Sequence, residues 1–127
     1  MEYNITSATV ADVVEVSGRI AASESMDLTR HLEAHLSNDA VRAIVLDLSR
    51  VDYMSSAGLG TVVWLGKRLR EAKRGFAVFG LRERVAQVFK LSGLDRILPI
   101  YPDLAEAEAA IEKGASDGAD VAGRQPG

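Results

Sequence analysis

The chain has 127 residues, of which 47% are hydrophobic and 26% charged, and this predicts one globular domain with a single core. It has no cysteine, which excludes disulfides, thiolate metal sites and thiol catalysis. Its net charge of −3 gives no electrostatic basis for binding nucleic acid. Because neither a signal peptide nor an apolar stretch of membrane-spanning length is evident, we expect a cytoplasmic protein without membrane contact.

The first part of the chain predicts two strands, a helix and a third strand. Apolar residues alternate in the two opening strands, at Tyr3 and Ile5 and then at Val14 and Val16. A helix follows over residues 23–36, with apolar residues near helical spacing at Met26, Leu28, Leu32 and Leu36. The strand over residues 41–51 contains an unbroken apolar run, Ile44–Leu46, as expected of a central strand that is covered on both faces.

A longer amphipathic helix is predicted over residues 55–73, before a short buried strand over residues 76–81. The apolar stripe of this helix consists of Leu59, Val62, Val63 and Leu69. The helix therefore has one face for the core and one for solvent.

The last part of the chain predicts two more helices around a final strand. The helix over residues 82–93 turns three apolar residues inward and has Gly93 at its carboxyl cap. These inward residues are Val85, Val88 and Phe89. The strand over residues 97–101 contains Pro99, which favours a sheet edge, and a helix covers residues 103–113.

The predicted order of elements is β-β-α-β-α-β-α-β-α. Strands that alternate with helices favour a mixed, mostly parallel sheet with right-handed crossovers, so the predicted fold class is α/β. We assign residues 1–113 to this domain and residues 114–127, which are mostly small and polar, to a flexible tail. In such sheets, sites form where strands end and helices begin, and the segment YMSSAGLG, Tyr53–Gly60, is a junction of this kind.

Enzyme motifs do not fit this junction. A serine nucleophile needs the pattern G-x-S-x-G, but Met54 replaces the first glycine around Ser56, and both histidines precede the serine. A dinucleotide loop needs a third glycine where the chain has Val63. A Walker loop needs serine or threonine after Gly-Lys, where the chain has Arg68.

Metal-binding and acid–base interpretations are weaker still. His31 and His35 share a face of their predicted helix, but Glu33 is displaced from the position that H-E-x-x-H requires, and no third ligand is evident. Asp47 and Asp52 lie near the junction, where acids are common as cap and turn residues. We therefore expect no metal, no cofactor and no catalytic residue.

Two interpretations of the paired serines remain. Ser55 or Ser56 caps the helix, because a side-chain oxygen there accepts a free backbone N–H. A cap alone does not account for Gly58 and Gly60, each of which costs a helix about 0.5–1 kcal/mol relative to alanine. The glycines leave the backbone approachable by another molecule, which indicates that one serine is presented to a kinase.

The sequence resembles a STAS domain of the anti-sigma factor antagonist family over about residues 3–113. The resemblance is carried by VVEVSGRI, AIVLDLSRVDYMSSAGLGTVVWL, FAVFGL and VAQVFKLSGLDRILPIY. The middle block is the most specific, with an aliphatic strand, D-L-S, and then S-S-A-G-L at the next helix.

This resemblance implies that Ser56, two residues before Gly58, is phosphorylated, with Ser55 as the less favoured alternative. Ser55 stands where relatives often have aspartate, and Ala57 where they often have a second serine. Many members also have an acid just after the second strand, where this chain has Ala21.

The function that the resemblance implies is partner switching. Unphosphorylated, the chain binds an anti-sigma factor with ATPase-type serine-kinase activity and frees a sigma factor. When it is phosphorylated, the chain dissociates from the anti-sigma factor, and a serine phosphatase then removes the phosphate. The expected contact residues are Ala22, Ser23, Ser55, Ser56, Ala57, Gly58, Gly60 and Arg82. The alternative is a STAS-like structural subunit of an ABC-type lipid-transport complex, which needs no phosphorylation.

Overall fold

The computed structural model of the chain describes residues 1–114, which form a five-stranded sheet with helices on both faces. The strands are β1 (Glu2–Ser7), β2 (Asp12–Ile20), β3 (Ala43–Met54), β4 (Gly75–Phe79) and β5 (Ile100–Tyr101). The helices are α1 (Ala22–Leu36), α2 (Ser56–Glu71), α3 (Glu83–Leu91) and α4 (Leu104–Glu112), with a 3-10 turn, η1, at Leu94–Arg96. The α/β class and the predicted order of elements are confirmed.

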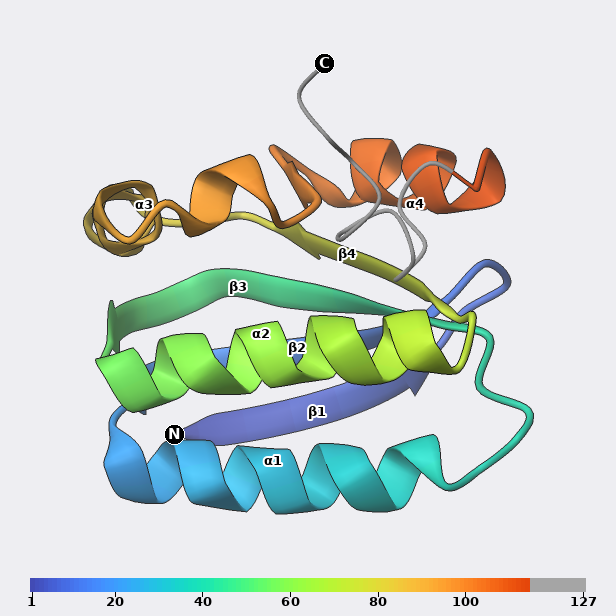
Figure 1. Cartoon of the computed structure of the whole chain (residues 1–127), viewed down its shortest axis with the longest axis horizontal. Coiled ribbons are helices and arrows are strands. Elements are labelled where there is room, and N and C mark those ends of the chain that lie inside the picture. Colours follow the sequence, from blue (N-terminus) through green and yellow to red (C-terminus); the bar gives the residue numbers. More distant parts are fainter. Residues whose placement is uncertain (115–127) are drawn as a thin grey trace.

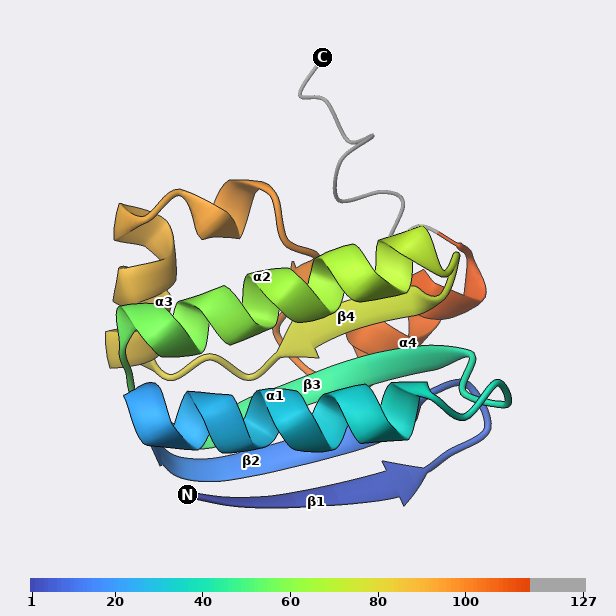
Figure 2. The same ribbon diagram turned by 60° about the horizontal axis from the view of Figure 1, so that its bottom comes forward.

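The strand order in the sheet is β1-β2-β3-β4-β5. Only β1 is antiparallel to its neighbour, and the other three pairs are parallel. As Figures 1 and 2 show, α1 and α2 lie side by side on one face of the sheet, and α4 covers the other face. α3 packs against β3. This topology brings the carboxyl ends of β2, β3 and β4 to one edge.

The main core lies between the sheet and the α1–α2 pair, and α3 contributes Val85 and Phe89 to it. A smaller apolar cluster, which includes Val45, Ala77 and Ala107, joins α4 to β3 and β4. β3 therefore has apolar contacts on both faces, as its unbroken aliphatic run predicts.

The predicted apolar stripe of α1 is wrong at its first position. Leu28, Leu32 and Leu36 are buried, but Met26 is 65% exposed and Ser25 is buried in its place. Ser25 satisfies its hydroxyl by donating to the carbonyl oxygen of Ala22 at 2.9 Å. A small serine can thus face α2 where the two helices begin.

The stripe of α2 is also shifted from the prediction. Val63 is only half-buried, whereas Leu65, which the prediction left out, is completely buried. Gly66 is buried as well, since a Cβ there would lie 3.3 Å from the Phe76 ring. The helix therefore packs closely on β4 through the side that contains Leu65 and Gly66.

Several element limits differ from the prediction, most of all those of β3 and β5. β3 runs to Met54, three residues beyond its predicted end, and β5 is reduced to Ile100–Tyr101 because η1 and buried Leu98 precede it. β5 forms the sheet edge, as Pro99 predicts. α3 ends at Leu91, and Gly93 has a φ of +80°, as expected for its role after the helix. The expected tail lies outside the described residues except for Gly114.

Candidate functional site

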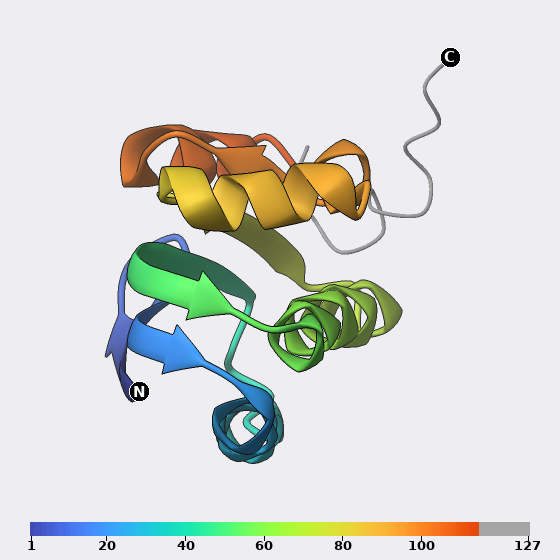
Figure 3. The same cartoon turned by 90° about the vertical axis from the view of Figure 1, so that its left-hand side faces the viewer.

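Three predicted contact segments follow the carboxyl ends of β2, β3 and β4 at the same end of the sheet (Figure 3), and we call this surface the docking edge. The docking edge consists of residues 21–24 at the start of α1, residues 55–60 at the start of α2, and Arg82 just before α3. Its two long helices begin side by side, and Ser55 donates its backbone N–H to the carbonyl oxygen of Ile20 at 2.9 Å. The start of α2 is therefore joined to the end of β2.

Ser55 is the N-cap of α2. Its backbone is extended, with φ −81° and ψ 174°, and its Oγ accepts the backbone N–H of Gly58 at 3.2 Å. The side chain is thus engaged in the fold, and the residue is half-buried. Of the two alternatives for the cap, the structure selects Ser55.

Ser56 is the first residue of α2 and is exposed, as is Ala57 beside it. Within residues 1–114, the Ser56 hydroxyl has no hydrogen-bond partner. The two serines therefore differ in chemistry: Ser55 is occupied by the helix start, and Ser56 presents a free hydroxyl to an approaching molecule.

The two glycines of the junction have different roles. Gly60 is exposed, and a Cβ there would meet nothing within 4 Å. Gly58 is buried, and a Cβ would lie 2.7 Å from Met54 Cγ and 3.1 Å from the Ile20 carbonyl oxygen. The interpretation that both glycines leave room for a partner is wrong for Gly58, which instead lets α2 approach the ends of β2 and β3.

Residues 22–25 form the first turn of α1, which begins one residue earlier than predicted, and Ala22 and Ser23 are exposed there. Glu24 Oε1 accepts the backbone N–H of Ala21 at 3.0 Å, and Glu24 Oε2 accepts the Ser23 hydroxyl at 3.3 Å. The N–H of Ala21, then that of Glu24 itself, lowers the pKa of the Glu24 carboxyl below its usual value. A carboxylate is therefore held at the start of α1, three residues after Ala21.

Arg82 is held at the docking edge by a bulge in β3. The pairing of β2 with β3 shifts between Asp47 and Arg50, and Asp47 Oδ1 accepts the backbone N–H of Ser49 at 2.9 Å. Arg82 Nε donates to the Ser49 carbonyl oxygen at 2.9 Å. Gly80, with φ +80°, allows this approach, because a Cβ there would lie 2.9 Å from Ser49 Cβ. The D-L-S motif therefore shapes the bulge that positions Arg82.

A pair of threonines, one half-buried on α1 and one buried on α2, links the two helices behind the docking edge. The hydroxyls of Thr29 and Thr61 lie 2.9 Å apart, and Thr61 is 6% exposed. Thr61 Oγ1 also lies within hydrogen-bond distance of the Ser25 and Ala57 carbonyl oxygens, at 3.3 and 3.4 Å. Sequence reasoning missed this link, since threonine in a helix gives no signal about its partner.

A second arrangement missed from the sequence is the contact between Arg19 and Tyr53. The two residues are cross-strand partners on β2 and β3, and the Arg19 Cζ lies 4.2 Å from the centroid of the Tyr53 ring. Arg19 is exposed, and among the described residues no carboxylate pairs with it. An uncompensated cation therefore lies beside the docking edge.

The two histidines are engaged separately. His35 Nε2 lies 2.7 Å from Asp12 Oδ2, and the His31 ring lies 4.7 Å from the Tyr3 ring. No group of three metal-ligating side chains occurs within residues 1–114. The same part of the chain contains no helix that is both long enough and apolar enough to span a membrane.

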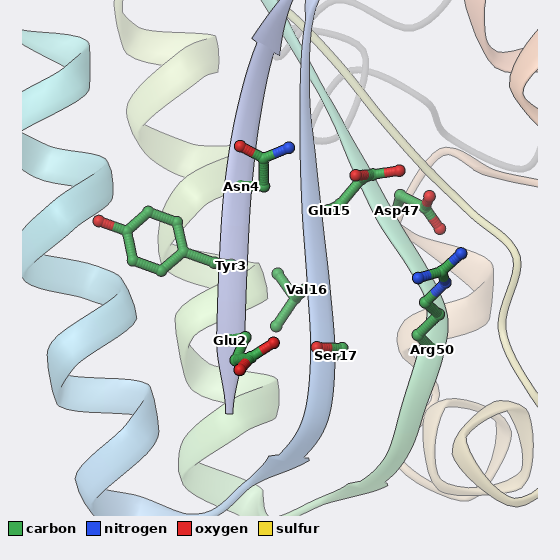
Figure 4. A pocket seen from close by; sticks show the side chains of 8 residues that line it. All are labelled: Glu2, Tyr3, Asn4, Glu15, Val16, Ser17, Asp47 and Arg50. Carbon is green, nitrogen blue, oxygen red and sulfur yellow. The ribbon is translucent and has the colours of Figure 1, made fainter.

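A small pocket of about 160 Å³ lies apart from the docking edge, over β1, β2 and β3 (Figure 4). Its lining is mostly polar and consists of Glu2, Tyr3, Asn4, Glu15, Val16, Ser17, Asp47 and Arg50. Asp47 already accepts the Ser49 N–H, so part of this lining supports the bulge in β3. None of the predicted contact residues lines the pocket.

Comparison with known proteins agrees with this architecture. The STAS domain model matches residues 4–107. A protein of Bordetella bronchiseptica named "Putative anti-sigma factor antagonist BtrV" is 33% identical over 97 residues, which are 76% of this chain and 83% of that protein. The anti-sigma-B factor antagonist of Listeria monocytogenes is 33% identical over 67% of this chain and 74% of its own length.

A solved structure shows the same arrangement. The crystal structure of an anti-sigma factor antagonist from Mycobacterium paratuberculosis superposes with a TM-score of 0.79 at 29% identity, covering 87% of this chain and 93% of that one. The family model, the sequence relatives and this structure agree on nearly the whole described fold. The chain therefore belongs to the STAS domain family.

Proposed function

We propose that the chain is an anti-sigma factor antagonist that works by partner switching at the docking edge. The observation that carries the proposal is the free, exposed hydroxyl of Ser56, which stands beside an occupied Ser55. The names of the relatives support the same function. The partner is an anti-sigma factor with serine-kinase activity of the ATPase type, and the chain is its substrate rather than an enzyme.

The modification transfers one phosphoryl group. Ser56 Oγ attacks the γ-phosphorus of a nucleoside triphosphate that the kinase holds, and the bond from that phosphorus to the bridging oxygen breaks. The nucleoside diphosphate leaves, and the hydroxyl proton passes to a base of the kinase. A serine phosphatase reverses the state by adding water to the phosphate ester, which restores the hydroxyl and releases inorganic phosphate.

The fold tolerates the phosphate, whereas the partner does not. At a helix N-terminus, free N–H groups and the helix dipole favour an anion, so the modification does not oppose the start of α2. The phosphate adds about −1.5 to −2 charges at neutral pH. To bury that charge against a surface that fits a neutral serine costs enough free energy to release the partner.

We assign the surface that contacts the partner from the predicted contact residues that are exposed to solvent. Ser56, Ala57 and Gly60 on α2, Ala22 and Ser23 on α1, and Arg82 before α3 face solvent at the docking edge. Ser55 and Gly58, which the sequence also placed in contact, support this surface from below, since one caps α2 and the other is buried. The partner therefore contacts a surface made mostly of small side chains.

The experiment is affinity capture from a cell lysate with the full chain as bait, combined with intact-mass measurement. Wild-type chain and Ser56→Ala are expected to retain a kinase-type anti-sigma factor, whereas Ser56→Asp loses it. A species heavier by about 80 Da is expected in wild type and Ser55→Ala but not in Ser56→Ala. Equal capture by Ser56→Asp, or no heavier species, contradicts the proposal, and capture of a permease subunit favours the lipid-transport alternative.

A further inference from the structure

We propose that Arg19 is the receptor for the phosphate on Ser56, so that β2 contributes a counter-charge to the modified site. This inference rests on the proposed phosphorylation of Ser56 and concerns what the phosphate contacts within the same chain. Its observation is the exposed guanidinium of Arg19, held 4.2 Å from the Tyr53 ring centroid without a carboxylate partner in the described part of the chain.

Backbone pairing places Arg19 one residue before the point where the end of β2 is joined to the start of α2. Arg19 pairs with Tyr53 across the strands, and one residue further along Ile20 pairs with Met54. The Ser55 N–H then donates to the Ile20 carbonyl oxygen at 2.9 Å, so the two chain segments remain joined up to the residue before Ser56. The Arg19 guanidinium lies beside the Tyr53 ring, and from Tyr53 to Ser56 the chain spans at most about 10 Å, so the flexible arginine side chain turns from the ring toward the phosphate.

The chemistry of the pair suits a phosphate. A guanidinium above an aromatic ring uses its planar face, which leaves its N–H donors for an anion. Two such donors match two phosphate oxygens, and this charge-assisted contact is stronger than an exposed cation–π contact. Before modification, the Tyr53 ring holds the guanidinium near the position where the phosphate forms.

Other charged groups at the docking edge are less available. Arg82 already uses Nε for the Ser49 carbonyl oxygen, and Glu24 accepts two hydrogen bonds at the start of α1. Asp52, exposed on β3 next to Tyr53, has the same sign as the phosphate. Within residues 1–114 no hydrogen bond or ion pair occupies the donors of Arg19, which lies beside the docking edge.

The test uses the full chain with phosphoserine installed at position 56 during translation, so it needs no kinase. Phosphorus NMR then measures the second pKa of the phosphate in wild type, in Arg19→Gln and in Arg42→Gln. Arg42 is an exposed arginine just before β3, at the opposite end of that strand, and serves as a matched control. A nearby cation favours the dianion, so Arg19→Gln is expected to raise this pKa by about half a unit, while Arg42→Gln leaves it unchanged.

A second measurement needs no variant. The proton–nitrogen NMR signal of Arg19 Nε is expected to shift when the unmodified and phosphoserine chains are compared, while that of Arg42 stays in place. Equal phosphate pKa values in wild type and Arg19→Gln, or an unmoved Arg19 signal, would overturn the inference. If the chain were never phosphorylated in cells, the proposed function would be contradicted instead. Failure of the Arg19 inference can therefore be distinguished from failure of the proposed function.

Discussion

The Oγ of Ser55 lies 3.2 Å from the backbone nitrogen of Gly58 and accepts its hydrogen, while the adjacent Ser56 hydroxyl points to solvent without a described partner. Of these two consecutive serines, Ser55 therefore has a structural role, whereas the Ser56 hydroxyl is accessible to a modifying enzyme. It predicts that stability and modification respond to different substitutions.

Ser55→Ala is expected to lower the free energy of unfolding by about 1 kcal/mol, because the Gly58 N–H loses its cap. Ser56→Ala is expected to change it by less than about 0.5 kcal/mol, because an exposed hydroxyl is replaced by a good helix former. Urea denaturation of both variants checks this. A larger loss for Ser56→Ala than for Ser55→Ala would reverse the assignment of the two serines.

Gly58→Ala and Gly60→Ala form a matched pair of variants, and we expect them to change the free energy of unfolding in opposite directions. The Cβ at position 58 meets Met54 Cγ at 2.7 Å and the Ile20 carbonyl oxygen at 3.1 Å, so we expect destabilisation of about 1–3 kcal/mol. The Cβ at position 60 enters open space, so we expect stabilisation of about 0.5–1 kcal/mol. Thermal and urea unfolding measure both. If the two substitutions had the same effect, close packing of Gly58 would not be the reason for its glycine.

Arg82→Gln is expected to lower the free energy of unfolding by about 0.5–1.5 kcal/mol, because the hydrogen bond from Nε to the Ser49 carbonyl oxygen is lost. Arg84→Gln is the control, since this exposed arginine lies in the first turn of the same helix without a described partner. It is expected to stay within about 0.5 kcal/mol of wild type. Equal effects in urea denaturation would show that charge alone, rather than the bulge contact, is responsible.

Glu24→Gln tests the carboxylate at the start of α1 through pH. The folded-state pKa of Glu24 is lowered, so its charge stabilises the fold above the unfolded-state pKa, and this stabilisation is lost as the pH falls through the folded value. Glutamine keeps an acceptor oxygen but removes the charge. Wild type is expected to be more stable than Glu24→Gln at pH 7, and the difference is expected to be smaller at an acidic pH below the ordinary glutamate pKa of about 4.3. A difference that is equal at both pH values in thermal unfolding would contradict this.

The docking edge follows from the sequence to a considerable extent. Alternating strand and helix patterns predict parallel strands, and parallel strands place the segments after β2, β3 and β4 together. That reasoning places the segments that contain Ala22, Ser56 and Arg82 directly after β2, β3 and β4, and the structure has them in that order. It works because each segment directly follows a strand, so local order along the chain determines its place.

Features that depend on register or on distant neighbours escaped prediction. The role of Gly58 depends on Ile20, which is 38 residues earlier, and the place of Arg82 depends on a bulge at Ser49. The exposure of Met26 depends on which side of α1 meets α2, where Ser25 and Thr61 lie. A periodic pattern predicts that a helix has an apolar face, but it does not fix the angle at which that face meets its neighbour.

Three contacts fix the backbone of the docking edge. The Ser55 N–H donates to the Ile20 carbonyl oxygen, and Gly58 packs closely against the ends of β2 and β3. The Thr61 hydroxyl donates to the Ser25 carbonyl oxygen and so links α2 to α1. Such a surface is preorganised, so a partner loses little affinity to the ordering of loops. Under the proposed function, we therefore expect the chain to present the same backbone conformation to the kinase and to the phosphatase. The decision between binding and release then depends on what is attached to a single oxygen atom, and it can be made as quickly as that bond is formed or hydrolysed.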